Sequence, residues 1–272
     1  LVFSGVKYFY FAGGIIWLND YLELHDISYI ASNRTALHNE HDKSIAKKII
    51  QKANIRTADF FTTEPGEHQN EMSIPIAFPL FIKPLTGGDS RGVDANSIVY
   101  DFLSFQTKVL DIKRKHNLRS LAETYLPGKE YSVSILQDHS NENLKAMPIE
   151  IVVKKNINGH RILDYNIKEN DHETVIKVSD SKIFNLLSDL SKNAFTALGG
   201  KSLGRIDIKM DCRGVPHFIE ANLMPGLRKG YFYRSCLLNL NMSYEQMVLT
   251  VANNGLSSQG ARCLDHTPTA MH

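Results

Sequence analysis

Hydrophobic and polar residues alternate along residues 204–210, and this period of two predicts a β-strand with one polar and one apolar face. Residues 211–214 (DCRG) have the composition of a tight turn, in which the glycine is free to take a positive φ. A second short run, residues 217–222, is followed by a Pro-Gly pair that stops the strand. The pattern therefore predicts a β-hairpin over residues 204–226.

Other segments have helical or strand spacing. Apolar residues that recur every three to four positions predict helices over residues 18–25, 43–53, 98–115, 180–198 and 242–253. Short apolar runs bounded by turn residues predict strands over residues 27–30, 75–84, 131–136 and 146–153. Helices and strands mixed in this way are typical of an α/β or α+β fold.

Composition excludes several classes of protein. The chain has 272 residues, 43% hydrophobic and 22% charged, which fits a globular protein of one to three sub-domains. A net charge of +2 gives no basic field that would favour a nucleic-acid partner. No apolar run approaches the roughly 20 residues that span a bilayer, so no membrane partner is predicted, and the interrupted apolar stretch over residues 1–18 is interpreted as core. Three cysteines without C-x-x-C spacing favour a reduced cytoplasm over a zinc site or a disulfide framework.

The predicted hairpin has a chemical consequence. If it closes around residues 212–214, Asp207 and Glu220 become cross-strand neighbours, roughly 5 Å apart at Cβ. Two carboxylates that close repel each other unless a cation lies between them, and together with Asn222 they form an oxygen-only set that suits Mg²⁺. A solvated face with ordinary charges is the alternative. It is favoured for Asp207 alone but not for the whole set with Arg205.

The same residues carry a family resemblance. The pattern R-x-D, followed by E-x-N-x-x-P-G, resembles the metal-binding end of the ATP-grasp ligases, and most closely that of the D-alanine–D-alanine ligases. The resemblance implies that Mg²⁺, which Mn²⁺ could replace, is held by Asp207, Glu220 and Asn222. It also implies that Arg205 steadies the transferring phosphate and that a backbone N–H near Gly226 faces a developing oxyanion.

A glycine-rich turn over residues 86–92 follows Lys83. Such a turn lets backbone N–H groups approach phosphate oxygens, although the Walker A pattern is absent and most such turns are only turns. With the strand before it, the segment resembles the phosphate lid of ATP-grasp ligases. Lys83 would contact nucleotide phosphates, and Ser90 with the loop amides would cover the γ-phosphate. The resemblance assigns phosphate contacts to Lys43 and Lys168 as well; for Lys43, a solvated lysine in a helix's first turn is an equal alternative.

Residues 121–130 (LAETYLPGKE) resemble the hinge where an ATP-grasp fold grips adenosine. On that resemblance Glu123 faces the adenine amino group, Glu130 bonds the ribose hydroxyls, and the pocket is lined by Thr124, Tyr125 and Leu126. A buried acceptor beside a donor-bearing ring gives a physical reason for the first carboxylate. Taken alone, both glutamates would more often be surface charges.

The resemblance implies an ATP-grasp fold in which two sub-domains sandwich ATP. We expect a remnant of an amino-terminal substrate domain over residues 1–42, a small sub-domain over 43–126, a carboxy-terminal sub-domain over 127–255 and a loose tail over 256–272. The family has a complete amino-terminal α/β domain where this chain offers about forty residues, so that domain is expected to be truncated or reduced.

The amino-acid half of the site departs from the family pattern. The chain has Asp89 where D-alanine–D-alanine ligases have a Ser, and Glu169 where they have a Tyr. Their hydroxyl-rich segment after Pro-Gly is replaced by residues 227–232, with Tyr231 near the family's Ser. Arg228 and Lys229 would suit a carboxylate-bearing or otherwise anionic acceptor.

These features predict a cytoplasmic, ATP-dependent carboxylate–amine ligase that forms an amide through an acyl phosphate. Its partners would be small molecules, namely amino acids or another carboxylate and amine, and a homodimer is left open. Two alternatives also stay open: a D-alanine–D-alanine ligase proper, and an inactive module that only binds ATP.

Overall fold

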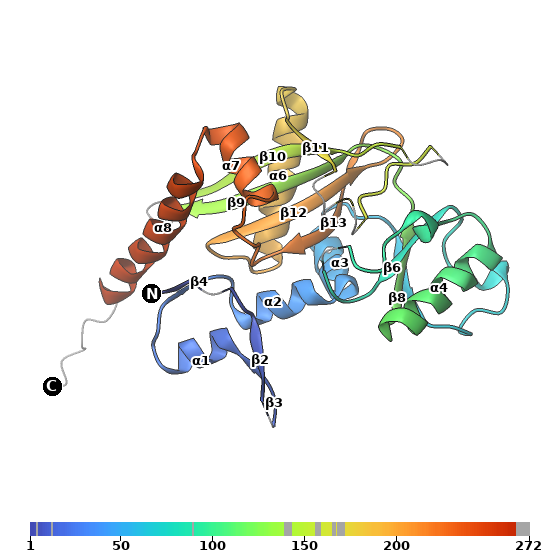
Figure 1. Cartoon of the computed structure of the whole chain (residues 1–272), viewed down its shortest axis with the longest axis horizontal. Coiled ribbons are helices and arrows are strands. Elements are labelled where there is room, and N and C mark those ends of the chain that lie inside the picture. Colours follow the sequence, from blue (N-terminus) through green and yellow to red (C-terminus); the bar gives the residue numbers. More distant parts are fainter. Residues whose placement is uncertain are drawn as a thin grey trace.

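The computed structural model describes the backbone of residues 1–264, except residues 4, 12, 89, 139–142, 156–158, 165–166 and 168–171, and describes side chains as far as residue 256. In this part of the chain, two antiparallel sheets of five and four strands form the framework, with helices packed on them (Figure 1). A two-stranded hairpin and a two-stranded parallel sheet lie nearer the amino terminus.

The larger sheet has the strand order β11-β10-β9-β12-β13. Its strands are β9 (Glu130–Asp138), β10 (Asn143–Val152), β11 (Thr174–Lys177), β12 (Leu203–Met210) and β13 (Pro216–Asn222). Alternation along β12 buries Ile206 and Ile208 in a core with helix α6 (Ser181–Ala197). The same alternation turns Arg205 and Asp207 to the other face of the sheet, so burial of the isoleucines decides where the polar residues point.

Helix α6 begins and ends as its sequence predicts. The Asp180 side chain accepts hydrogen bonds from the backbone N–H groups of Lys182 and Ile183, which caps the first turn. After the helix, Gly199 takes a φ of 79°, a conformation that favours glycine at a helix end. On the opposite face of the larger sheet, α7 (Tyr231–Leu240) packs on β9, β10 and β11.

The smaller sheet has the strand order β5-β8-β6-β7, and α4 (Phe102–His116) packs on it. Its strands are β5 (Phe60–Thr63), β6 (Leu80–Pro84), β7 (Ile98–Val99) and β8 (Ser120–Thr124), with short 3-10 turns at Glu71–Ser73 and Ala95–Ser97.

Two predicted boundaries in the smaller sheet are wrong. The helix predicted from residue 98 begins at Phe102, because Asp101 and Ser104 form a capping box and the residues before them pair with β6. The strand predicted over residues 75–84 starts only at Leu80. Two prolines in residues 75–79 lack the N–H that a strand ladder needs.

Helix α3 (Lys43–Lys52) lies between the two sheets and contacts β5, β13 and α6. Its predicted start is confirmed, because the Asp42 carboxylate accepts from the backbone N–H groups of Ser44 and Ile45. No sequence pattern had indicated α2 (Arg34–His41), which precedes α3 directly.

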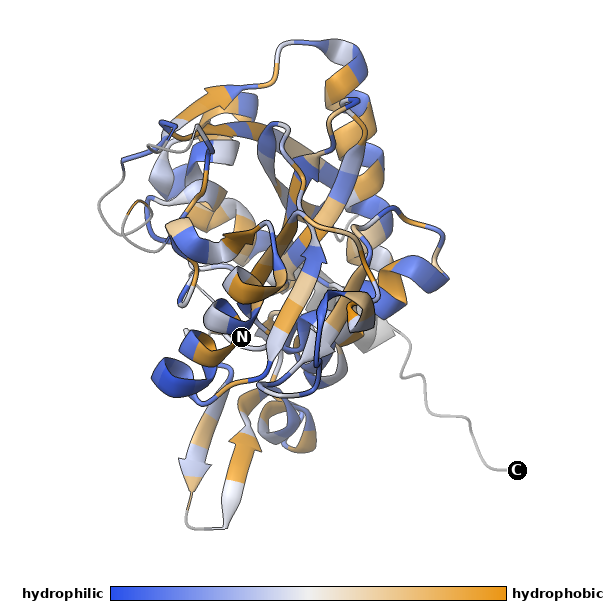
Figure 2. Cartoon of the chain, turned by 90° about the vertical axis from the view of Figure 1, so that its right-hand side faces the viewer, coloured by the Kyte–Doolittle hydropathy of each residue, from blue (hydrophilic) through white to orange (hydrophobic). Residues whose placement is uncertain are grey.

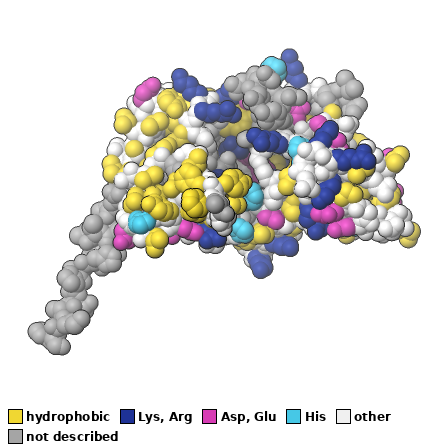
Figure 3. Space-filling model, turned by 60° about the horizontal axis from the view of Figure 1, so that its bottom comes forward, with side chains coloured by type: hydrophobic (Ala, Val, Ile, Leu, Met, Phe, Trp, Pro, Cys, Tyr) yellow, Lys and Arg dark blue, Asp and Glu magenta, His cyan; other side chains and the backbone are white. Residues whose placement is uncertain are grey.

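The amino-terminal region contains β1 (Val2–Phe3), the hairpin β2 (Tyr8–Phe11) and β3 (Gly14–Trp17), α1 (Leu18–Leu24) and β4 (Tyr29–Ile30). The hairpin projects from the rest of the chain in Figures 1 and 2. The interpretation of residues 1–18 as core is therefore wrong for most of the hairpin, where Tyr10 and Phe11 are 78% and 72% exposed. Figure 3, which brings the underside of the view in Figure 1 forward, shows hydrophobic side chains gathered on one part of this face.

Helix α8 (Tyr244–Leu264) extends well beyond the predicted end at residue 253, so the predicted loose tail does not begin at residue 256. A side chain on Gly255 would fall 2.4 Å from Ile30, which shows how closely this part of the helix packs on β4. None of the described helices is long and apolar enough to cross a membrane.

Candidate functional site

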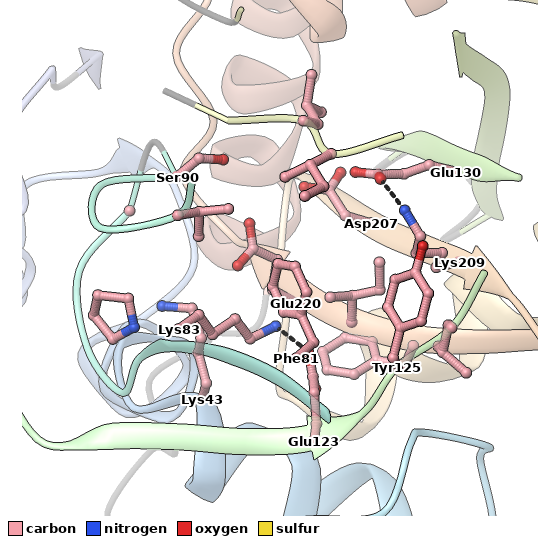
Figure 4. Close-up of a pocket in the computed structure, with 18 of the residues that line it drawn as sticks. Lys43, Phe81, Lys83, Ser90, Glu123, Tyr125, Glu130, Asp207, Lys209 and Glu220 are labelled. Carbon is pink, nitrogen blue, oxygen red and sulfur yellow. Dashed lines mark hydrogen bonds and ion pairs between the residues drawn. The ribbon is translucent and has the colours of Figure 1, made fainter. Parts of the chain in front are cut away.

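A cavity of about 900 Å³, open to solvent, lies between the two sheets. The smaller sheet, the larger sheet and the glycine-rich loop all contribute to its wall (Figure 4). Ten residues predicted to serve in nucleotide or metal binding line it: Lys43, Lys83, Ser90, Glu123, Thr124, Tyr125, Leu126, Glu130, Asp207 and Glu220. Its mixed polar and apolar wall is typical of a small-molecule site.

The glycine-rich loop is held against α3. The Lys43 Nζ donates to the Gly87 carbonyl oxygen at 2.8 Å, and the Lys43 backbone N–H donates to Leu85. Gly87 has a φ of 93° and Ser90 a φ of 57°, so the loop turns back over the cavity through left-handed positions. Burial lowers the pKa of Lys43, although the nearby Glu220 carboxylate opposes the change. The first turn of α3 therefore places one cation beside the loop.

One end of the cavity, called the base end because the family resemblance assigns adenine to it, is built around Glu123 on β8. Oε1 of this carboxylate lies 2.7 Å from Nζ of Lys83, and Oε2 lies 2.8 Å from Nζ of Lys47 (Figure 4 shows the Lys83 pair). Burial alone would raise the pKa of Glu123, but the Lys47 and Lys83 ammonium groups outweigh it and hold the pKa below its ordinary value. Glu123 is thus a buried, charged acceptor with two cations attached.

A further ion pair lies farther along the cavity. The Lys209 Nζ donates to Oε2 of Glu130 at 2.7 Å, and both side chains line the wall (Figure 4). Tyr125 lies close by, and its hydroxyl is 3.3 Å from Nδ1 of His160. A ribose hydroxyl at this end would meet an acceptor that is already fixed by Lys209.

Two of these lysines were missed in the sequence, although each leaves a signal there. Lys47 follows Lys43 by four residues, which puts both on one side of α3. Lys209 follows Asp207 by two residues, which puts both on one face of β12.

The predicted hairpin pairing is confirmed. Asp207 lies opposite Glu220, and Arg205 lies opposite Asn222, with a β-bulge after Asp207. Arg205 grips the Asp207 carboxylate through two contacts of 3.0 Å, and the Ser132 hydroxyl donates to Oδ1 of Asp207 at 2.7 Å. Burial alone would lower the pKa of Arg205, but the Asp207 carboxylate more than compensates and raises it. The guanidinium therefore stays charged beside Asp207, which lines the cavity.

The donor chemistry of this hairpin fits a hard divalent ion. Two carboxylates face each other across the strands, and the amide oxygen of Asn222 follows, where it accepts from the Met224 backbone N–H at 3.3 Å. In the part of the chain that the structure describes, no three His, Cys, Asp or Glu side chains group as a metal site. A site here would therefore use two carboxylates and an amide, and would need water or phosphate oxygens to complete its shell.

The predicted acceptor residues lie beside this hairpin. Tyr231 opens α7, and its ring lies 5.6 Å from the Arg205 guanidinium. Burial, together with the Glu173 carboxylate, raises the pKa of the Tyr231 hydroxyl far above its ordinary value. Lys229 lies over the Tyr244 ring at 5.7 Å.

The remaining predicted residues are either exposed or outside the described part of the chain. Arg228 and Gly226 are exposed in the segment before α7. Asp89, Lys168 and Glu169 lie outside the described residues.

Comparison with known proteins identifies the family. The model of the family described as "D-ala D-ala ligase C-terminus" matches residues 49–253. The chain belongs to this family.

Curated relatives agree with that membership. The chain is 25% identical over 248 residues to D-alanine–D-alanine ligase A of Mesorhizobium japonicum. This alignment covers 89% of this chain and 68% of the relative. It is 26% identical over 251 residues to D-alanine–D-alanine ligase of Natranaerobius thermophilus, with 88% and 66% covered. The chain thus spans about two thirds of the length of these curated relatives.

Solved structures show the fold. The D-alanine–D-alanine ligase of Bacillus anthracis, in a complex with ATP, superposes with a TM-score of 0.70 at 23% identity, over 90% of this chain and 76% of that one. The VanG D-Ala:D-Ser ligase of Enterococcus faecalis gives 0.71 at 20% identity, over 88% and 68%. The expected ATP-grasp fold is confirmed, and membership in this ligase family confirms the expected enzyme class, the ATP-dependent ligases that form carbon–nitrogen bonds.

Proposed function

We propose that this family member joins a carboxylate to an amine at the expense of ATP, with amino acids as substrates. The observation that carries the proposal is the cavity itself, in which Lys43, Lys83 and Glu123 face Asp207 and Glu220 of the other sheet. The cavity thereby combines lysine ammonium groups that can bind phosphate, a carboxylate that can accept from a nucleotide base, and carboxylate oxygens that can bind a metal ion.

In the proposed reaction a carboxylate oxygen of the donor attacks the γ-phosphorus of ATP, and ADP leaves. The product of this step is an acyl phosphate. The uncharged amine of the second substrate then attacks the acyl carbon, inorganic phosphate leaves, and the amine nitrogen loses a proton as the amide forms. No nucleophilic side chain is required, because placement and electrostatics lower the barrier.

The described residues divide this work. Lys43 and Lys83 would bind phosphate oxygens, and Ser90 with the loop amides would cover the γ-phosphate. Glu123 would accept from the adenine amino group, next to a pocket wall of Thr124, Tyr125 and Leu126, and Glu130 would bond the ribose. These assignments rest on the family resemblance and on the shared cavity.

The hairpin would serve the phosphoryl transfer. Asp207, Glu220 and Asn222 would hold Mg²⁺ or Mn²⁺, which supplies neutralisation of the charge that develops on phosphate oxygens. Arg205 would share that charge from the neighbouring strand position, and the backbone N–H at Gly226 would face the oxyanion of the acyl carbon. Lys168 is proposed to contact phosphate on the resemblance alone.

Two hypotheses about the amino-acid substrates rest on different observations. The names of the relatives favour D-alanine as both donor and acceptor. The departures at Asp89, Arg228, Lys229 and Tyr231 instead favour another acceptor, one that carries an additional anionic group. We propose the second reading, because Arg228 and Lys229 together add two positive charges to the segment that follows the metal hairpin.

The test is ADP release by the purified protein with Mg-ATP, offered D-alanine alone and then amino acids and small carboxylates in pairs. Release that depends on a pair containing an acidic acceptor supports the proposal, and mass spectrometry should then find the amide. Release with D-alanine alone would replace the acceptor assignment by the family's ordinary one. ATP binding without any ADP release across the panel would contradict the ligase proposal and favour an inactive module.

A further inference from the structure

A second buried lysine lies behind the base end of the cavity. The Lys47 side chain, on α3, is 0% exposed. Its Nζ lies 2.8 Å from Oε2 of Glu123 and donates to the Thr57 hydroxyl at 2.6 Å and to the Ala58 carbonyl oxygen at 3.5 Å. It also lies 5.3 Å from the centre of the Phe60 ring. Four partners from two segments of the chain, residues 57–60 and the strand that carries Glu123, therefore fix this ammonium.

Lys83 holds the other oxygen of the same carboxylate but has a different position. It lines the cavity, and its Nζ lies 2.7 Å from Oε1 of Glu123. Nucleotide phosphates in the cavity would compete for it, because charge-assisted bonds from ammonium to phosphate are strong. Once Lys83 turns to phosphate, Lys47 is the cation that stays on Glu123.

We propose that Lys47 is a positioning residue for the nucleotide base, which fixes the Glu123 carboxylate at the base end of the cavity while Lys83 serves the phosphates. This inference rests on the proposed function, because it takes the cavity to hold ATP with its adenine beside Glu123. The two lysines on one carboxylate then have separate tasks. Lys47 stays paired with Glu123, and Lys83 leaves Glu123 to bind the phosphates of the ligand.

The surroundings of Lys47 also connect the two halves of the site. The Thr57 hydroxyl, which accepts from Lys47, donates to the Phe218 carbonyl oxygen on β13 at 2.8 Å. Phe218 lies two residues before Glu220, and its ring is fully buried. A single ammonium thus ties β8 of the smaller sheet, through Glu123, to the metal-binding strand of the larger one.

Charge explains why this cation matters when ATP binds. Other charged or titratable groups that act on the cluster of Lys47, Lys83 and Glu123 are Lys43, Asp59, Glu130, His217 and Glu220. Several of these are carboxylates, and the cluster is buried. If Lys47 were absent and Lys83 turned to phosphate, Glu123 would have no close counter-ion and would take up a proton.

The experiment is calorimetric titration of the whole chain with Mg-ATP at pH 7.5 in buffers of different ionisation enthalpy, which counts protons taken up per ATP bound. The variant is Lys47→Met, which keeps the length of the side chain and removes its charge. We expect the wild type to take up close to no protons at Glu123 and Lys47→Met to take up as much as about one more per ATP, with about ten-fold or more weaker binding. Discrimination of ATP against GTP should fall in the same variant, since GTP lacks the amino group that Glu123 would accept from.

Lys108→Met is the matched control. Lys108 is a lysine on α4 that is 2% exposed and paired with the more exposed Asp94 at 2.8 Å, so its replacement also removes a buried ammonium from an ion pair. We expect its proton uptake and its ATP affinity to equal those of the wild type. Equal proton uptake and equal affinity in Lys47→Met and the wild type would overturn the proposal.

Two further outcomes are defined in advance. If Lys47→Met does not fold, the double variant with Glu123→Gln carries the test: the proposal expects it to fold, because an amide needs no counter-ion, and an unfolded double variant overturns it. A wild type that does not bind Mg-ATP at all contradicts the proposed function itself, which separates the two failures.

Discussion

Asp207 and Glu220 face each other across the hairpin, but they have different neighbours. Asp207 is gripped by the guanidinium of Arg205 and by the hydroxyl of Ser132, whereas Glu220 faces the cavity beside the ammonium groups of Lys43 and Lys83. Asp207 therefore has a structural task in addition to the proposed metal contact. Substitutions at the two carboxylates should separate these tasks.

Glu220→Gln should lower turnover by at least about 100-fold, because the metal's charge stabilisation is worth several kcal/mol. It should also raise the Mg²⁺ concentration that gives half-maximal activity, with a loss of stability below about 1 kcal/mol. Asp207→Asn should lower turnover similarly and should also cost about 3 kcal/mol of stability, because Arg205 loses its charged partner in a buried position. Steady-state kinetics at several Mg²⁺ concentrations measures turnover of both variants, and urea unfolding measures their stability. A Glu220→Gln enzyme with normal turnover and normal Mg²⁺ dependence would refute the metal assignment.

Much of this chemistry could be predicted because it follows strand alternation. Asp207, Glu220 and their opposed register follow from period two and a short turn, and both were placed correctly. The spacing of Lys47 from Lys43 puts both on one side of α3 but does not indicate that Lys47 is buried, because a lysine in a helical pattern normally faces water. Its burial depends on Glu123, which is 76 residues away in the chain.

The loop between β8 and β9 approaches the hairpin closely at Gly128. Its backbone N–H donates to the Met210 carbonyl oxygen at 3.0 Å, and a Cβ built on it would lie 2.6 Å from that oxygen. Gly214, in the hairpin turn, has open space around it and a φ of 77°. The two glycines are therefore needed for different reasons, one steric and one conformational.

Gly128→Ala should destabilise the chain by about 2–3 kcal/mol through overpacking, and should also weaken ATP binding, since Leu126 and Glu130 flank this position. Gly214→Ala should cost about 1 kcal/mol, the penalty of a left-handed backbone for alanine, and leave ATP binding unchanged. Urea unfolding and ATP titration of both variants test this ordering, and a larger loss for Gly214→Ala would be inconsistent with it.

Helix α2 carries a buried carboxylate that no sequence pattern indicated. Glu40 accepts hydrogen bonds from the Lys7 ammonium and from the backbone N–H of Leu223, the residue after Asn222. Burial raises the pKa of Glu40 above its ordinary value of 4.5, and Lys7 only partly opposes this. The folded chain therefore holds this proton more tightly than the unfolded chain does.

The sign of the pH dependence follows. The stability that comes from protonated Glu40 is fully present below pH 4.5 and is lost as the pH rises through the raised pKa. Glu40→Gln cannot titrate, so its free energy of unfolding should fall less than that of the wild type between pH 4.5 and pH 7.5. Urea unfolding at several pH values measures both slopes. A steeper fall in the variant would show that Lys7 outweighs burial at this site.

The elements themselves were predictable where a cap marks their ends. The helices predicted from residues 43 and 180 begin within one residue of those positions, where Asp42 and Asp180 cap α3 and α6. The hairpin of β2 and β3 was not predicted, because its apolar residues read as core while the structure leaves Phe9, Tyr10 and Phe11 exposed. Whether such apolar side chains are buried depends on which other elements pack over them. The local sequence pattern holds no information about that packing.

The whole molecule places two sheets around one cavity, and every part of the proposed reaction depends on that arrangement. Lys43, Lys83 and Glu123 come from one side, and Glu130, Asp207 and Glu220 come from the other. Their order in the chain and the family resemblance predicted that they would meet. We propose that the departures near Arg228 and Tyr231 concern the acceptor and not the phosphoryl transfer.

The central claim is that ATP activates a carboxylate as an acyl phosphate. Its most direct measurement is the fate of ¹⁸O in the carboxylate of the donor amino acid during turnover with Mg-ATP. The account predicts that one labelled oxygen appears in inorganic phosphate for each amide formed, because the oxygen that attacks the γ-phosphorus leaves with it. Amide formation with unlabelled phosphate, or with AMP and pyrophosphate in place of ADP, would contradict the account.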